Sequence, residues 1–519
     1  MPFPRFWDVE RGQVCDEFLD FHTVGQEPAD LQVAHILETF AKLDIHLNKM
    51  ICLSRDNPSV MQKVFRLLQD ASKEAQCPRL VDAPCLLHPT HTSFMVAVKS
   101  MDRVLVRLLG NLHGFFKTST ARREDMVEVR EELAERLEEE LEEVLEQFFL
   151  RHVATRWLEA GPAIKRLLDH WDSTVEFFMK YLPNSPLANN KKAVKSKKYK
   201  AIALHLKDDE VIKTKVRAKF LLFLSSLPKI FLTELQSEKP CVYKLLPMAA
   251  EMFKSLAAVI IIPAKRPTSF KEIKDLDLKN KSILMDGVDC SFNSCCREEL
   301  NSMEREERKS MRREMKGAVL AMMSHQQTRF PWLDPLLSDL QFLNPKLRLD
   351  PKTAERGVGA AQGLKSFKEE EERMVGVQMN LYQALAEEEV PPFPAKGRID
   401  HWWVKVLRIL EEKADTKQVE LERLVMLCCS ISHGNAFLER GMSATKRVVD
   451  GRSSISELGV KANKLVKNHS ECGTEARWSH GGAHHQAPAP GRQPVVLQVP
   501  RGAEEGEGGE EQGREDQGR

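Results

Sequence analysis

Apolar and polar residues change their spacing several times within the first 91 residues. Runs of strand composition are followed by stretches in which apolar side chains recur three and four residues apart, which is the spacing of a helix face. The predicted elements are strands at 3–10 and 14–24, a helix at 29–48, a strand around 51–55, a helix at 58–75 and a strand at 80–87. This order predicts a mixed α/β sheet with a parallel portion.

Helical spacing dominates from residue 94 onward. Residues 128–149 combine many glutamates with apolar side chains at every third or fourth position. This fits either an amphipathic helix with a solvated face or a coiled-coil seam. Residues 346–363 are predicted to form a loop, and the proline-rich residues 390–396 a linker. Residues 400–446 are predicted to form helix, helix, loop and helix.

The composition limits the class of protein. The chain has 519 residues, 42% of them hydrophobic, which suits two or three domains with a substantial core. Eleven cysteines without any CxxC pair indicate reduced thiols in an intracellular protein. The sequence has no secretory leader and no run of about 18 apolar residues, so we expect neither secretion nor a membrane span. Residues 473–519 are poor in apolar side chains and are predicted to be disordered.

Charge is placed unevenly although the net charge is only +1. Residues 191–200 (KKAVKSKKYK) form a basic cluster with one tyrosine. Such a cluster suits contacts with phosphates. A solvated loop or the start of a helix explains it equally well.

Short motifs are distributed along most of the chain. Together they resemble the hAT family of transposases and the domesticated genes descended from them, over about residues 3–465. The motifs are Asp56-Asn57-Pro58-Ser59-Val60-Met61, Cys85-Leu86-Leu87-His88, Thr155-Arg156-Trp157, Trp402-Trp403, the segment 435–443 with its Glu439-Arg440 pair, and Arg452-Ser453-Ser454.

The resemblance implies a ribonuclease H-like fold, α/β plus α, in which a large, mainly helical insertion interrupts a mixed sheet that lacks its first strand. The implied domains are residues 1–155 (N-terminal part of the ribonuclease H-like domain), 156–395 (helical insertion), 396–470 (C-terminal dimerisation region, which completes the fold) and 471–519 (disordered tail).

The resemblance also implies a metal site. In active members two aspartates and one glutamate hold divalent cations, which activate the attacking water and stabilise the leaving oxygen. By resemblance Asp56 is the second ligand and Glu439 the third. We expect the strand with the first aspartate to be missing, no nearby acid to replace it, and the site to be vestigial with no metal bound. Mg²⁺ is the expected cofactor only if the site is complete.

Other motif positions have structural roles by resemblance. No Cys/His spacing typical of a zinc-binding BED finger is found. The positions implied to be structural are Cys85, His88, Arg156 and Trp157. Those implied to serve dimerisation are Trp402, Trp403, Leu424, Leu427 and Arg440.

Each motif also has a plainer interpretation. Asp56, which directly precedes an Asn-Pro pair, suits the N-cap of a helix. Cys85 and His88 make only half a zinc site, and we favour a buried thiol and a hydrogen-bonded imidazole that hold the strand end. Glu439 and Arg440 also suit a structural ion pair.

The expected function is that of a transposase-derived, catalytically inactive protein. We expect it to be nuclear or cytoplasmic, to associate with itself through about residues 400–465, and to contact DNA or chromatin proteins, without a membrane or a small-molecule substrate. The apolar segments 404–410 and 421–429 are expected to supply the dimer surface. The alternatives are a metal-dependent DNA transposase or nuclease whose first aspartate comes from elsewhere, and a truncated product without function.

Overall fold

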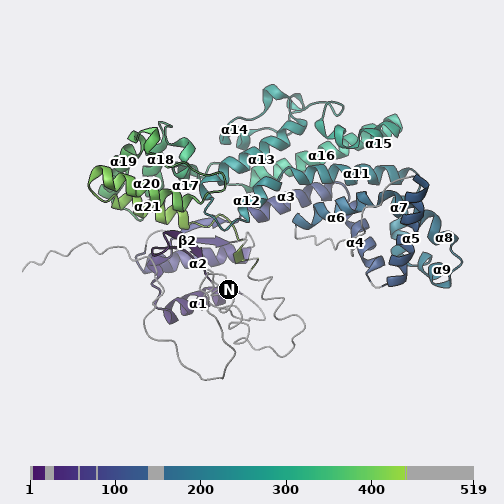
Figure 1. The fold of residues 1–519 in the computed structure, drawn as a ribbon, viewed down its shortest axis with the longest axis horizontal. Helices are drawn as coiled ribbons and strands as arrows, with labels where there is room; N and C mark the ends of the chain where they lie inside the picture. The colour runs from purple at the N-terminus through teal and green to yellow at the C-terminus, as the bar shows by residue number, and fades with distance from the viewer. Residues whose placement is uncertain are drawn as a thin grey trace, which may run out of the picture.

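The computed structural model describes residues 4–17, 28–55, 59–77, 80–117, 119–137, 157–435, 437, 438 and 440. Helices dominate it, and the strands lie toward one end of an elongated molecule (Figure 1). The coarse prediction, a helix-rich chain with a small strand component, is confirmed. The later part of the acidic segment, 138–150, and residues 441–519, including the tail predicted to be disordered, lie outside the described residues.

The first two strands form a hairpin. β1 (Arg5–Asp8) and β2 (Gln13–Asp16) pair antiparallel, with Trp7 opposite Val14. Gly12 lies in the turn with φ +59°, a conformation that glycine adopts without steric cost. Trp7 and Val14 are both buried, so one face of the hairpin packs on the core.

The next two strands are parallel. β3 (Cys52–Arg55) pairs with β4 (Val81–Pro84), with Arg55 opposite Pro84. The helices α1 (Ala29–Lys42) and α2 (Ser59–Glu74) pack on each other. They share a small core of their own, which is formed by Ala29, Val33, Val64, Leu68 and Leu80.

The single mixed sheet that we predicted is wrong for the described residues, because the four strands form two separate pairs. Side chains hydrogen-bond to a backbone N–H and carbonyl of β2 that would otherwise pair with a further strand. The Val14 N–H donates to Asp400 Oδ2 at 2.9 Å, and Arg398 donates to the Val14 carbonyl at 2.9 Å. An ion pair of 2.6 Å joins Arg398 to the fully buried carboxylate of Asp400. The hairpin is therefore anchored by the start of α20 (Ile399–Ala414) and its N-cap Arg398.

The fourth strand is shorter than predicted. It ends at Pro84, and α3 (Leu87–Ser100) begins within the segment expected to be extended. Pro84 has no N–H, so the strand ladder cannot continue through it. Pro89 lies in the first turn of α3, where a missing N–H costs nothing.

Beyond α3 the described chain is a succession of helices. A π-helical turn at Phe177–Tyr181 joins α7 to α8. The remaining helices are α4 (Val104–Phe116), α5 (Thr120–Leu137), α6 (Trp157–Asp169), α7 (Trp171–Glu176), α8 (Leu182–Asn184), α9 (Ala188–Val194), α10 (Lys197–Leu206), α11 (Asp208–Ser226), α12 (Lys229–Leu235), α13 (Leu245–Ile260), α14 (Phe270–Asp275), α15 (Arg297–Ser302), α16 (Arg305–Arg329), α17 (Pro335–Asp339), α18 (Thr353–Leu364), α19 (Glu369–Ala384), α20 (Ile399–Ala414) and α21 (Val419–Ser430).

One continuous core joins the hairpin to these helices. Its middle is the contact between α16 and α3, where buried methionines of α16 such as Met315 and Met322 meet a helix that buries Phe94 and Ala97. Methionine fills irregular gaps well, which suits this long contact. No helix in the described ranges is both long and apolar enough to cross a membrane.

The predicted loop at residues 346–363 is wrong, because α18 occupies most of it. The segment contains three glycines, and all three allow close approach of other elements, Gly359 by facing the Asp339 carboxylate of α17. A Cβ at Gly357 would lie 2.8 Å from Met379 Cγ, and one at Gly363 would lie 3.0 Å from Leu336 Cδ1. These glycines let α18 pack closely against α19 and α17.

Candidate active site

The candidate site lies at the carboxyl end of the parallel strand pair. Arg55, the last residue of β3, is buried and forms an ion pair with Asp82 of β4 at 2.5 Å. Its guanidinium also lies over the ring of Phe65 on α2, 5.6 Å from the ring centroid. The strand end is thus fixed between β4 and α2. Asp56 follows directly but lies outside the described residues.

The chain returns to this strand end after α21. The Ser54 hydroxyl on β3 donates to Asn435 Oδ1 at 2.6 Å, across 381 positions of sequence. The Asn435 backbone N–H donates to the Cys85 thiol, with 3.3 Å between nitrogen and sulfur. Asn435 and Cys85 are buried. The segment that leads to Glu439 is therefore held at both strand ends, although Glu439 itself lies outside the described residues.

Two neighbours of Asn435 pack against the body of the protein. A Cβ at Gly434 would lie 3.4 Å from the Leu235 carbonyl oxygen and 3.6 Å from Leu87 Cδ1, in ordinary van der Waals contact with both. The His433 ring is buried and its Nε2 lies 2.9 Å from the Ser237 carbonyl oxygen. A carbonyl can only accept, so Nε2 carries the hydrogen.

Burial governs the titration of His433. Burial, together with the charges of Arg5 and Arg440, lowers the pKa of His433 to about 3, against an ordinary value near 6.5. Its Nδ1 has no hydrogen-bond partner among the described residues. The ring is therefore neutral at physiological pH.

Residues 236–238 join the hairpin to the end of the described chain. Arg440 donates to the Gln236 carbonyl at 2.9 Å and pairs with Glu238 at 3.0 Å. Arg5 of β1 donates to the Glu238 carbonyl at 3.3 Å. Arg440, implied to serve dimerisation, thus makes contacts within its own chain.

One carboxylate of the hairpin faces the same region. Asp16 forms an ion pair with Arg5 at 2.8 Å. Burial raises the pKa of Asp16, while Arg5 and, more weakly, Arg440 oppose that shift. Asp8 pairs instead with Arg11 near the hairpin turn. Among the described residues, no three His, Cys, Asp or Glu side chains form a group that could hold a metal ion.

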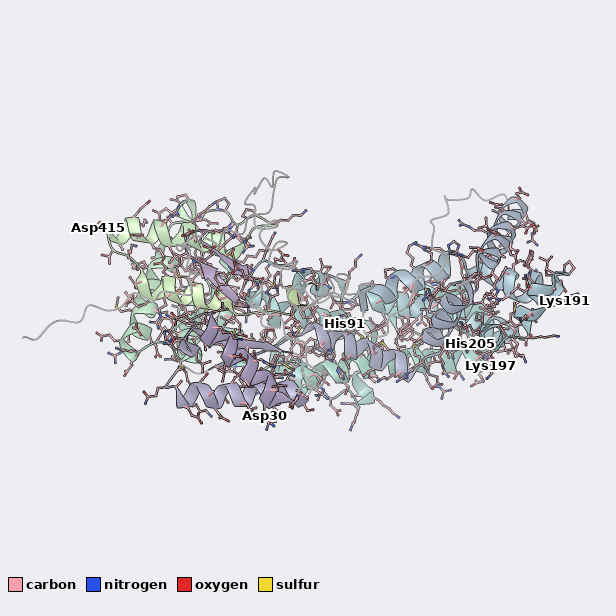
Figure 2. The ribbon with its side chains drawn as sticks, turned by 90° about the horizontal axis from the view of Figure 1, so that it is seen from below. Asp30, His91, Lys191, Lys197, His205 and Asp415 are labelled. Carbon is pink, nitrogen blue, oxygen red and sulfur yellow. The ribbon has the colours of Figure 1, made fainter. Side chains whose placement is uncertain are left out.

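The Cys85 and His88 positions separate in the structure. Cys85 is buried and holds the strand end, as we favoured. His88 lies exposed in the first turn of α3, so its imidazole does not hold the strand end as expected. His91, one turn further on, lies in the central part of the molecule (Figure 2), and burial lowers its pKa to about 4. Arg156 and the side chain of Trp157 lie outside the described residues.

Four of the five residues implied to serve dimerisation, all except Arg440, are core residues. The Trp403 indole donates to the Leu343 carbonyl at 3.0 Å and the Trp402 indole to the Pro391 carbonyl at 2.7 Å. Both rings are buried, as are Leu424 and Leu427. Segment 421–429, expected to supply the dimer surface, is therefore covered within the chain, mainly by α19, α20 and the hairpin. In segment 404–410, Val404, Leu407 and Ile409 are half-buried.

Sequence reasoning missed the contacts that assemble this region. Asn435 was part of a motif, but nothing in the sequence indicated that its partners are Ser54 and Cys85. For Asp400 the sequence held a stronger signal. It is an acid at the start of an apolar, tryptophan-rich helix, and an acid that is buried needs a hydrogen-bonding or charged partner.

No protein-family model matches this chain, and no curated protein matches it either. The family therefore stays a proposal, supported by the motifs and by the placement of their neighbours.

We expect His433→Gln to weaken the acid sensitivity of the fold. Below pH 6.5 the unfolded chain binds a proton that the folded chain rejects until about pH 3. Stability therefore falls by about 1.4 kcal/mol per pH unit in this window, or about 2 kcal/mol from pH 6.5 to pH 5. Urea denaturation of the parent and the variant at several pH values measures the difference in slope.

The control is His46→Gln, at an exposed histidine, which should keep the parent's slope. An equal pH slope in the parent and in His433→Gln would show that His433 does not cause the acid sensitivity.

Proposed function

We propose that this chain is a hAT-transposase-derived protein that does not catalyse strand transfer. It acts in the nucleus through association with itself and with DNA or chromatin proteins. The observation that carries the proposal is the position of Asn435, which binds Ser54 of β3 and Cys85 after β4. Segments that carry two of the motifs, nearly four hundred residues apart in sequence, are therefore in direct contact.

Chain connectivity relates these contacts to the carboxylates. Asp56 follows Arg55 by one residue, and Glu439 follows Asn435 by four. Consecutive Cα atoms are about 3.8 Å apart, so four steps span at most about 15 Å. A pair of carboxylates on one side of a strand end is the arrangement that a shared divalent cation needs. The contacts of the residues near Asp56 and Glu439 therefore support the proposal that these two acids are the remnant of a metal site.

The proposal of inactivity rests on the number of ligands. Two carboxylates hold a pair of cations poorly, because each cation then keeps few protein ligands. Asp16 is one described candidate for a third, because it lies close enough to Arg440 for that charge to oppose the rise in its pKa that burial causes. Its ion pair with Arg5 already compensates its charge, which opposes its use as a ligand.

A second candidate function is a metal-dependent DNA transposase or nuclease of the hAT type. The observation that favours it is the same Asp16, because it senses the charge of Arg440, the residue after Glu439. If Arg5 releases Asp16 when metal binds, three carboxylates become available.

A strand-cleavage assay separates the two functions. We expect the full chain to leave a DNA duplex uncut with Mg²⁺ or Mn²⁺, because its metal site is incomplete. Cleavage by the parent that Asp56→Asn abolishes would refute inactivity, and its loss in Asp16→Asn would identify the third ligand. Asp30→Asn is the control, since Asp30 at the start of α1 is exposed and pairs with Lys63 of α2 (Figure 2).

Self-association needs an exposed apolar surface, and α19 supplies one. Met374, Val377 and Leu381 recur at spacings of three and four and expose 40%, 52% and 41% of their surface. No other described helix carries more than one such exposed large apolar side chain. The opposite face of α19 buries Val375 and Met379 against α18 and α21. We place the contact between two copies on this stripe rather than on the segments predicted from the sequence.

Light scattering of the full chain tests this association. We expect twice the monomer mass for the parent and the monomer mass for a Val377→Asp/Leu381→Asp variant, since a charge in an apolar contact leaves an uncompensated buried group. Ile230→Asp, at an exposed side chain of α12, should leave the dimer intact. A monomeric parent, or a dimer unaffected by the α19 variant, would contradict the proposal.

A further inference from the structure

The strongest concentration of charge lies far from the strand ends. Between Pro186 and Lys207 the sequence has seven lysines and no acidic residue. Six of them, on α9 and α10 and in the turn between these helices, are exposed and form what we call the lysine cluster: Lys191, Lys192, Lys195, Lys197, Lys198 and Lys200. Lys191 and Lys197 lie at the end of the molecule opposite Asp415 (Figure 2), near α8 and α9 in Figure 1.

The lysine cluster is presented by a well-packed scaffold. Asn190 of α9 is buried and donates to Asp125 of α5 at 3.1 Å and to Ser185 at 3.0 Å. Ser196 caps α10 by accepting from the Tyr199 N–H at 3.2 Å. Ile202 of α10 is fully buried. The opposite sides of both helices are thus anchored, so the lysines project from fixed backbone.

The lysine cluster is not paired with acids among the described residues, although Asp125 of α5 lies close by, bonded to Asn190. None of its six ammonium groups forms an ion pair with a carboxylate of the described residues. Lys198 donates to the Gly114 carbonyl at 2.9 Å. Lys197, Lys198 and Lys200 occupy the first turn of α10, where the positive end of the helix dipole opposes cations. In the free protein these lysines therefore repel one another and the N-terminus of α10, and a bound polyanion would reduce this repulsion.

The chemistry of the surface favours the backbone of a nucleic-acid duplex. Lysines bind phosphates as point charges and read no sequence. Single strands are bound by stacking bases on exposed aromatic rings. The one aromatic residue of this segment, Tyr199, is buried, stacked on Phe178 and hydrogen-bonded to its carbonyl at 2.9 Å. Exposed apolar side chains that would enter a membrane are limited here to Leu187 and Leu204.

We propose that the lysine cluster binds the phosphate backbone of duplex DNA without sequence preference. The choice of DNA over RNA rests on the proposed function, whereas the binding of a duplex polyanion rests on the lysines alone. The cluster does not involve Asp56 or Glu439. Failure of DNA binding therefore leaves the metal-site proposal standing, and cleavage activity would leave this proposal standing.

Fluorescence anisotropy with the full chain tests the proposal. The probe is a labelled DNA duplex of arbitrary sequence and about 30 bp, titrated from about 50 to about 200 mM KCl, where phosphate contacts weaken steeply. In the test variant Lys191, Lys195, Lys197 and Lys200 are changed to Gln. We expect about 100-fold weaker binding, and a salt slope smaller by about 3 to 4 because four phosphate contacts are lost.

Two matched variants separate the position of the lysines from the total charge of the chain. The first changes Lys229, Lys265, Lys271 and Lys281 to Gln, which removes the same charge from exposed positions elsewhere and should leave binding nearly unchanged. The second changes the four cluster lysines to Arg, which keeps the charge and should keep the affinity.

Several results would overturn the proposal. They are a parent that does not bind the duplex at low salt, equal losses in the two Gln variants, and loss of binding in the Arg variant. Tighter binding of duplex RNA or of anionic phospholipid vesicles than of DNA, lost in the same Gln variant, would reject DNA as the partner.

Discussion

The contact of Asn435 with Ser54 and Cys85 closes the chain on itself. A short strand near the start of the chain and a segment after the last complete helix meet there, with the helical body between them. Asn435 is buried, so each polar group that it brings into the interior must find a partner or cost stability. Its side chain binds Ser54 of β3, and its backbone N–H binds Cys85, the residue after β4. This double attachment determines where the chain after α21 runs, and hence whether the neighbours of Asp56 and Glu439 come together.

A second buried polar group attaches the hairpin. Asp400 is fully buried, and its two oxygens accept from Val14, Arg398 and the His401 N–H. A buried charge is tolerated only when it is paired and hydrogen-bonded, which is the case here. The hairpin is consequently held by α20 rather than by β3 or β4. Trp402 and Trp403 follow Asp400 closely along α20 and are buried as well.

Local spacing predicted much of the fold. The hairpin, α1, β3, α2, the proline-rich linker and the pair α20 and α21 follow from period, turn residues and prolines, which act within a few residues. The prediction was wrong where distant partners decide. The segment that contains the glycines of α18 was predicted to be a loop. The sequence does not show that these glycines face Met379 and Leu336 on other helices, where a missing side chain allows close packing. The segment 421–429 was expected to supply a dimer surface. The sequence does not show that α19 packs on the leucines of this segment. Asp56 and Glu439 could be named by resemblance, but the contacts of Asn435 that relate them had no sequence signal.

A double-mutant cycle on Ser54 and Asn435 tests the central claim most directly. Ser54→Ala, Asn435→Ala and the double variant are compared by native-state hydrogen exchange of β3 and of residues 431–435. A direct hydrogen bond predicts that the free energies of opening are non-additive by about 1 kcal/mol. The same cycle between Ser54→Ala and Asn280→Ala, an exposed helix cap, should be additive. Additivity between Ser54 and Asn435 within about 0.3 kcal/mol would show that their side chains do not hydrogen-bond, and would contradict the account.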